Sequence, residues 1–217
     1  MGDALTLFCC VLVTTLAAEG VLCRVVAPAF LRQGHSVWGS IWDALFMSIS
    51  AFNNAGFVVM EEGLAACVGT WLVMLPLILA AFVGAIGFPV IVDLRRRWRH
   101  PKSLSLHSKI TLTTYIALAV VTGLMIAALE WNNPYTFGEL DFSEKALNTI
   151  VGAINTRSLG ISAIDVSQMT GASWLVQDIS MFIGGGSGSH AGGIKVTTFT
   201  ILVLAAWAEA RGRRDVE

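Results

Sequence analysis

Residues 37–57 read VWGSIWDALFMSISAFNNAGF, and this stretch decides the predicted fold. The part up to Phe52 is apolar and aromatic, but it is shorter than the roughly 20 residues that an α-helix needs to cross a bilayer. An apolar segment of such length is more often re-entrant or buried than membrane-spanning. Residues 53–57 (NNAGF) then predict that the helix stops at membrane depth and that irregular backbone follows.

A second segment of the same kind lies further along the chain. Residues 146–154 are short and semi-apolar, and they run into residues 155–161 (NTRSLGI). Gly56 and Gly160 occupy equivalent places in the two segments, 104 positions apart. Because internal repeats are common in transporters, the sequence predicts one structural unit used twice.

Longer apolar stretches flank both short segments. They comprise residues 5–23, 68–92, 110–129 and, on either side of a glycine-rich run, 172–183 and 194–208. The chain is 55% hydrophobic and only 13% charged, which is about half the charged fraction of soluble domains. We therefore expect an all-α membrane protein with two helix–pore loop–helix repeats, residues 1–104 and 105–217. The short pore helices would be re-entrant, and glycines would break the last transmembrane helix.

Basic residues indicate which side of the membrane faces the cytoplasm. Nine of the 14 lysines and arginines lie on the two polar segments that the predicted spans place on one side: Arg95, Arg96, Arg97, Arg99, Lys102, Lys109, Arg211, Arg213 and Arg214. Since cytoplasmic loops carry an excess of basic residues, we expect a multi-pass plasma-membrane protein with both termini cytoplasmic. The opposite loops carry acids that are either ordinary solvated residues or a cation-attracting outer mouth: Glu61, Glu62, Glu139, Asp141 and Glu144.

The backbone after each short helix predicts the chemistry of the chain. A helix that stops inside the membrane leaves carbonyl groups without partners, and these are tolerated where they line a water-filled pore or bind a cation. Potassium filters use rings of carbonyls in place of the hydration shell of the ion. Glycine suits such positions because it adopts unusual dihedral angles and leaves room for a narrow pore. Gly56 and Gly160 lie at the right places for such a carbonyl-lined filter.

Two long motifs resemble signatures of the Trk/Ktr/HKT superfamily of potassium transporters. Residues 50–57 (SAFNNAGF) are similar to a pore-loop signature of that superfamily. Residues 181–185 (MFIGG) and 191–195 (AGGIK) are similar to its glycine-rich intramembrane loop, and residues 156–160 (TRSLG) resemble another filter segment more loosely. The resemblance, to a TrkH/KtrB-like pore subunit, covers nearly the whole chain but only the second and third of the four repeats of that family.

The resemblance implies potassium transport, with sodium as the alternative ion, through a filter and a gate at defined residues. The filter would comprise Asn54, Ala55, Gly56, Phe57, Ser158, Leu159, Gly160 and Ile161. Arg157 would support it by donating hydrogen bonds to nearby carbonyls. The gate loop beneath the filter would comprise Gly184, Gly185, Gly186, Ser187, Gly188, Ser189, His190, Ala191, Gly192, Gly193 and Lys195.

Several residues depart from the family pattern or carry an unexplained charge. Leu159 stands where alanine is usual and adds bulk beside the filter. His190 is either a titratable group of the gate or an ordinary hydrogen-bonded loop residue. Lys195 either pairs with an acid or packs on backbone carbonyls. Asp178 either pairs with Arg157 or Lys195, or it precedes the true start of its span.

The sequence contains no catalytic constellation and no nucleotide-binding fingerprint, so we expect no enzyme activity and no bound cofactor. The predicted partners are membrane lipid and either the missing repeats or a second copy in a homodimer, and no nucleic acid is expected. The resemblance also implies a separate cytoplasmic ring protein that binds nucleotides. The basic loop 95–102 would contact that ring or anionic lipid, or it would set topology alone. A truncated half that is inactive by itself and a non-conducting membrane scaffold are the alternatives to a working pore.

Overall fold

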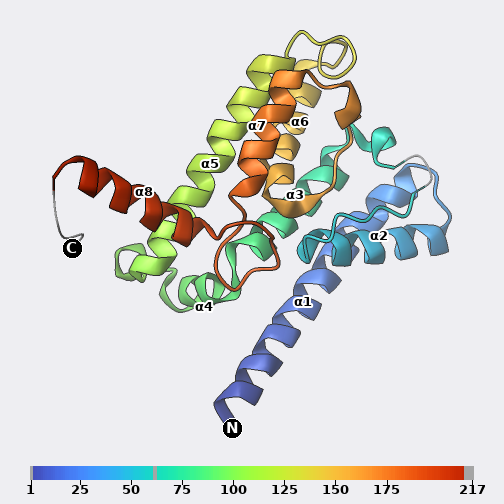
Figure 1. The fold of residues 1–217 in the computed structure, drawn as a ribbon. Coiled ribbons are helices and arrows are strands. Elements are labelled where there is room, and N and C mark those ends of the chain that lie inside the picture. Colours follow the sequence, from blue (N-terminus) through green and yellow to red (C-terminus); the bar gives the residue numbers. More distant parts are fainter. Residues whose placement is uncertain (1, 61–62, 213–217) are drawn as a thin grey trace.

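The computed structural model describes residues 2–60 and 63–212, and regular structure in these ranges is helical apart from one isolated bridge between Ile183 and Ile194 (Figure 1). The α-helices are α1 (Gly2–Arg32), α2 (Val37–Phe52), α3 (Trp71–Ile86), α4 (Phe88–Arg97), α5 (Leu106–Glu130), α6 (Phe142–Ile154), α7 (Gly171–Phe182) and α8 (Val196–Ala210). A short π-helical turn at Asn155–Leu159 follows α6. The predicted all-α class is confirmed.

The helices follow the same order in both halves of the chain. A long helix (α1, α5) precedes a short one (α2, α6), and a third helix (α3, α7) ends at a break after which a last helix follows (α4, α8). Helix α1 packs on α2 and α3, and α5 packs on α6 and α7. Within the described residues, α1 and α5 are each long and apolar enough to cross a membrane, and α3 with α4 adds a third candidate despite a bend of 99°.

Helix α1 is longer than the apolar stretch that predicts it. The sequence predicts a polar connection at residues 24–36, yet the helix continues to Arg32 and includes Pro28. Val26, Ala29 and Phe30 recur at helical spacing and are buried. Packing on one face therefore extends the helix beyond the residues that hydropathy selects.

Both short helices begin at a capped end. At the start of α2, the side-chain oxygen of Ser36 accepts a hydrogen bond from the backbone nitrogen of Gly39 at 3.1 Å. At the start of α6, Glu144 Oε2 accepts from the backbone nitrogen of Asp141 at 3.0 Å. These caps fix the residue at which each short helix starts.

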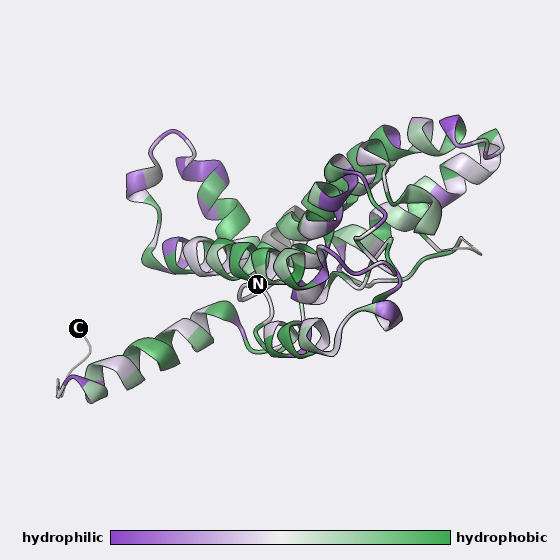
Figure 2. Ribbon diagram, turned by 90° about the horizontal axis from the view of Figure 1, so that it is seen from above, coloured by the Kyte–Doolittle hydropathy of each residue, from purple (hydrophilic) through white to green (hydrophobic). Residues whose placement is uncertain are grey.

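The two halves share one apolar core. Buried side chains from α1, α2, α3 and α6 meet in it, among them Val26, Met47, Leu77, Leu147 and Val151. Helix α8 instead projects from the body, and Val196 is its one buried residue (Figure 1). Figure 2 shows hydrophobic residues along most of the helices and hydrophilic residues mainly in connecting segments and at helix ends, and many large apolar side chains of the helices are exposed. This pattern suits a protein whose outer faces meet lipid or other membrane helices.

Candidate functional site

The two predicted filter segments lie against each other. Gly56 follows α2 with a φ of 75°, and Gly160 follows α6 with a φ of 72°. A Cβ atom on Gly56 would lie 2.9 Å from the Cα of Gly160, and one on Gly160 would lie 2.8 Å from the Cα of Gly56. Both positions therefore require glycine, for the left-handed backbone and for the close approach.

The backbone conformation of the two segments also repeats. Asn54 and Ser158 are the non-glycine residues with positive φ in the described part of the chain, at 51° and 70°. Each precedes its filter glycine by two positions, so the sign of φ alternates between negative and positive over residues 53–56 and again over residues 157–160. Alternation of this kind turns successive peptide groups toward the same side. A row of cation-binding carbonyls needs such an arrangement.

Side chains of α1 and α2 hold the first filter segment. Ser50 Oγ donates to the carbonyl oxygen of Phe57 at 2.7 Å, which ties the segment back to α2. Asn53 Nδ2 donates to Glu19 Oε1 at 2.7 Å, and Glu19 is a buried acid of α1. Ala55 is exposed, so one side of the segment is not covered by this chain.

Arg157 holds the second filter segment from inside the protein. It is the largest fully buried side chain among those described. Its Nη1 donates to the carbonyl oxygens of Ser180 at 2.9 Å and Ile183 at 2.6 Å, and its Nη2 donates to Thr122 Oγ1 at 3.2 Å. The two carbonyls lie where α7 ends and intrahelical partners run out. Arg157 therefore links the filter to the end of α7 and lies away from any exposed surface.

Asp178, Lys195 and His190, for which the sequence left alternatives open, form no hydrogen bond or ion pair with Arg157 within the described residues. Asp178 is exposed on α7 and forms no ion pair within the described residues. Lys195 Nζ donates to the carbonyl oxygen of Ala191 at 2.7 Å, which is the carbonyl-packing alternative. His190 is exposed, and its ring centroid lies 6.1 Å from that of Phe52.

The two ends of the glycine-rich loop between α7 and α8 are joined by backbone hydrogen bonds. The backbone nitrogen of Gly184 donates to the carbonyl oxygen of Ile194 at 2.9 Å, and that of Ile194 donates to Phe182 at 3.0 Å. A Cβ atom on Gly184 would lie 1.5 Å from the carbonyl oxygen of Gly192. The two ends of the loop thus pack more closely than any side chain at Gly184 would allow.

The loop contacts the second filter segment directly. The backbone nitrogen of Gly192 donates to Ser158 Oγ at 3.0 Å. A small cavity of about 120 Å³ lies beside the loop, and its lining includes Phe52, Gly84, Phe88 and His190. A hydrogen bond thus joins the loop to the second filter segment.

The loop also contacts the elbow between α3 and α4. Gly87 forms this elbow with a φ of 100°. The backbone nitrogen of Gly186 donates to the carbonyl oxygen of Ala85 at 2.8 Å, and that of Phe88 donates to Gly188 at 3.1 Å. These two bonds flank Gly87, so the elbow and the loop are joined on both sides of the bend.

One buried acid, Glu130, is not apparent from the sequence. Glu130, which the sequence assigns to a polar loop, is fully buried at the end of α5. Its carboxylate accepts hydrogen bonds from Asn133, Thr136, Thr170 and Ser173. It thereby fastens the loop after α5 to the start of α7. Two of these partners lie 40 or more positions away, so their convergence on Glu130 is invisible in a single sequence.

The acids of the expected outer mouth differ in their surroundings. Glu144 caps α6, whereas Glu139 and Asp141 are exposed. Glu61 and Glu62 lie outside the described residues. Asp141 and Glu144 together form the cap of α6, whereas Glu139 is exposed and lies outside that cap.

The sequence matches the family described as TrkH, cation transport protein, over residues 2–217. It is 36% identical to Ktr system potassium uptake protein B of Bacillus subtilis over 179 residues, which are 82% of this chain and 40% of that protein. The protein of the same name from Vibrio alginolyticus is 37% identical over 80% of this chain and 38% of its own length. Potassium/sodium uptake protein NtpJ of Enterococcus hirae is 32% identical over 82% of this chain and 39% of its own length.

The fold is similar to that of the potassium transporter TrkH from Vibrio parahaemolyticus, known from a crystal structure. The TM-score is 0.71 at 19% identity, and the match covers 90% of this chain and 41% of that one. The chain thus spans about 40% of the length of the relatives it matches. Since the family match extends over nearly every residue and the described fold agrees with it, the chain belongs to the TrkH family of cation transport proteins, which are integral membrane proteins.

Proposed function

We propose that this chain supplies half of a potassium-conducting filter, with Gly56 and Gly160 as its K+ sites. The proposal rests on the meeting of two segments that share the same alternation of φ and the same close-packed glycine. Two relatives are named as potassium uptake proteins, which favours K+ as the transported ion. A third is named for potassium and sodium, which favours Na+ as the alternative.

The two segments supply only part of the shell that a dehydrated ion needs. In potassium filters carbonyl oxygens surround the ion on all sides. Here the segments touch where Gly56 and Gly160 meet, so the ion path runs beside that contact and not through it. Further filter segments complete the ring, and they come from the missing repeats of a longer chain or from a second copy in a homodimer.

The remaining assignments follow from the repeat. Residues 1–104 and 105–217 form the two units, with α2 and α6 as re-entrant pore helices that enter from outside. The basic segments then face the cytoplasm, with both termini. Residues 184–193 with Lys195 act as the gate, which the bond from Gly192 to Ser158 supports. The family resemblance adds a separate nucleotide-binding ring protein as a regulator.

A chimera tests the half-filter directly. The part of the Bacillus subtilis relative that aligns with this chain is replaced by the matching residues of this chain, and the chimera is expressed in a bacterium without potassium uptake systems. We expect growth on low potassium and uptake of radioactive rubidium. In the chimera, Gly160→Ala should lower the uptake rate at least about tenfold, because a Cβ displaces the facing segment.

The matched control is Gly20→Ala, since Gly20 has no atom within 4 Å of the added Cβ and no positive φ. This variant should transport like the parent chimera. Equal uptake by the Gly160→Ala chimera and the parent would contradict the filter assignment. So would a chimera that reaches the membrane and transports nothing in any form.

A further inference from the structure

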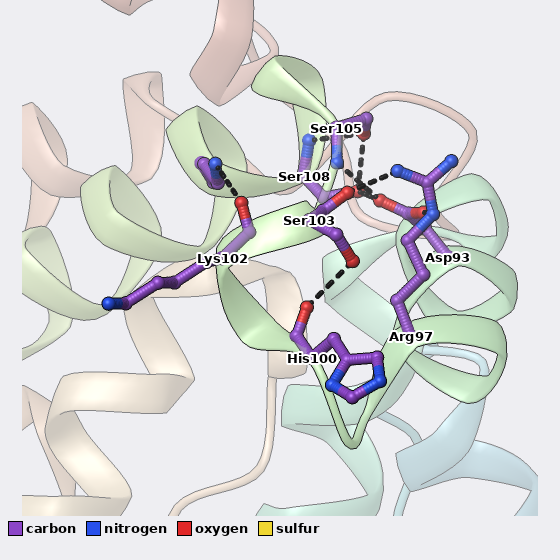
Figure 3. A network of polar contacts seen from close by, with 8 residues as sticks. Asp93, Arg97, His100, Lys102, Ser103, Ser105 and Ser108 are labelled. Carbon is purple, nitrogen blue, oxygen red and sulfur yellow. Dashed lines mark hydrogen bonds and ion pairs between the residues drawn. The ribbon is translucent and has the colours of Figure 1, made fainter.

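The hairpin between α4 and α5, here the basic hairpin (residues 93–109), is fixed by a polar network (Figure 3). Asp93 Oδ2 accepts from the backbone nitrogen of Ser105 at 2.9 Å and from Ser108 Oγ at 2.6 Å. Asp93 Oδ1 lies 3.2 Å from Arg97 Nε, and Arg97 also donates to the carbonyl oxygen of Ser103. Asp93 thereby ties α4 to the start of α5.

The basic hairpin carries six of the 14 lysines and arginines of the chain. Within the described residues, the side chains of two of the six form an ion pair or a hydrogen bond inside the hairpin. Arg97 bonds to Asp93, and Lys109 Nζ donates to the carbonyl oxygen of Lys102 at 2.8 Å. The other four are exposed and form no ion pair within the described residues: Arg95, Arg96, Arg99 and Lys102. In Figure 3 the side chain of Lys102 extends away from the network. The Asp93 network thus supports a segment with four exposed cations that form no ion pair within the described residues.

The direction of α4 places this surface along the membrane. Helices α3 and α4 meet at 99°, so α4 runs nearly at right angles to the apolar helix before it. When α3 crosses the bilayer, α4 follows the plane of its surface. Apolar side chains are exposed among the cations: Trp98 is 69% exposed and Leu106 is 74% exposed. The Arg99 guanidinium lies 5.1 Å from the ring centroid of Trp98.

We propose that the basic hairpin is a binding surface for anionic phospholipid headgroups. Guanidinium groups hold phosphate oxygens through paired hydrogen bonds, which assigns the phosphate to Arg95, Arg96 and Arg99. Tryptophan is enriched at the level of the headgroups, where its ring meets the acyl boundary. An acidic soluble protein would match the cations but not the exposed Trp98 and Leu106 beside them. The proposal does not depend on ion conduction and is tested without it.

Lipid titration of the purified full chain in detergent tests the surface. Phosphatidylglycerol is the anionic probe and phosphatidylcholine the neutral one, with bound lipid counted by native mass spectrometry. We expect the chain to prefer phosphatidylglycerol. The double substitution Arg95→Gln/Arg96→Gln should weaken phosphatidylglycerol binding by roughly twentyfold, at about fivefold for each charge removed near an anionic surface.

The matched control is Arg24→Gln/Arg32→Gln, which removes the same charge from exposed positions of α1 and should leave the preference unchanged. Neither arginine of the test pair belongs to the Asp93 network, so helicity should match the parent by circular dichroism. Equal weakening by both double substitutions would overturn the proposal, because net charge would then suffice. Binding of polyglutamate through Arg95 and Arg96 without any lipid preference would also overturn it and assign the surface to an acidic protein.

Discussion

The guanidinium group of Arg157 donates hydrogen bonds to three acceptors, and none of them is a carboxylate. The acceptors are the carbonyl oxygens of Ser180 and Ile183 and the hydroxyl of Thr122. A planar, fork-shaped donor reaches several acceptors at once, whereas a lysine ammonium is a point donor on a flexible stem. The Ser180 carbonyl also accepts from the backbone nitrogen of Ile183, so the Ile183 carbonyl is the one that depends on Arg157. A lysine that does not reach it would leave this carbonyl buried without a partner, which costs about 1–3 kcal/mol.

We therefore expect Arg157→Lys to lower the free energy of unfolding in detergent by about 1–3 kcal/mol. Amide hydrogen exchange across residues 183–194 should become faster, because that segment begins at the freed carbonyl of Ile183. Thermal unfolding and hydrogen-exchange mass spectrometry measure the two effects. Arg24→Lys, at an exposed position of α1, should change neither. If exchange across 183–194 stays at the parent rate in Arg157→Lys, Arg157 does not brace the loop.

The site residues differ in how well their roles can be predicted from the surrounding sequence. Gly56 and Gly160 could be predicted because each follows a short apolar helix at an equivalent place in the repeat. Asn54 and Ser158 share a positive φ with them, yet a left-handed conformation at a non-glycine residue leaves little trace in sequence. The bond from Gly192 to Ser158 was equally hidden, because it joins positions 34 apart that only the fold brings together.

At the scale of elements, the elbow at Gly87 joins α3, α4 and the glycine-rich loop. A Cβ atom on Gly87 would lie 2.4 Å from the carbonyl oxygen of Ser187, so the loop occupies the space beside the bend. The bonds from Gly186 to Ala85 and from Phe88 to Gly188 depend on that close approach. We therefore expect a movement of α4 to be passed to the loop that we assign as the gate.

Gly87→Ala should separate the elbow from the loop. We expect faster exchange of the Gly186 and Phe88 amides, because the added methyl group pushes the Ser187 backbone away. Hydrogen-exchange mass spectrometry of the purified chain follows both amides. Gly34→Ala is the control for backbone strain, since Gly34 has a φ of 95° but nothing within 4 Å of an added Cβ. Protection of both amides at the parent level in Gly87→Ala would mean that elbow and loop are not coupled.

The ends of a helix could be predicted from the sequence where the length or polarity of the segment determines them. They could not be predicted where packing against other elements determines them. The short helices α2 and α6 could be predicted because their apolar runs are too short to span. The run of residues 68–92 contains Pro76, Gly84, Gly87 and Pro89, and any of them is able to mark a break. Only the fold separates their roles: Gly84 packs against the carbonyl of Phe52 at the end of α2, while Gly87 makes the bend.

At the scale of the whole molecule, the chain corresponds to only part of its longer relatives. The family match covers about 40% of the length of its relatives, and the division of the chain into two repeats stays a prediction. Apolar side chains on α7 and α8 are exposed, including Leu175, Ile179, Phe182 and Trp207. Hydropathy identified these helices, but a single sequence does not distinguish a face that meets lipid from one that meets further repeats.

On its own, the chain is expected not to support potassium uptake. Its two filter segments touch at Gly56 and Gly160 and leave the rest of the ring to other segments. The test is growth on low potassium and rubidium uptake in an uptake-deficient bacterium, with immunoblots of the membrane fraction and the mass of the detergent-solubilised protein. A membrane-inserted chain without uptake agrees with a half that needs the remaining repeats. Uptake that is lost with Gly160→Ala but kept with Gly20→Ala, together with a dimer mass, would contradict it and show that a second copy completes the ring.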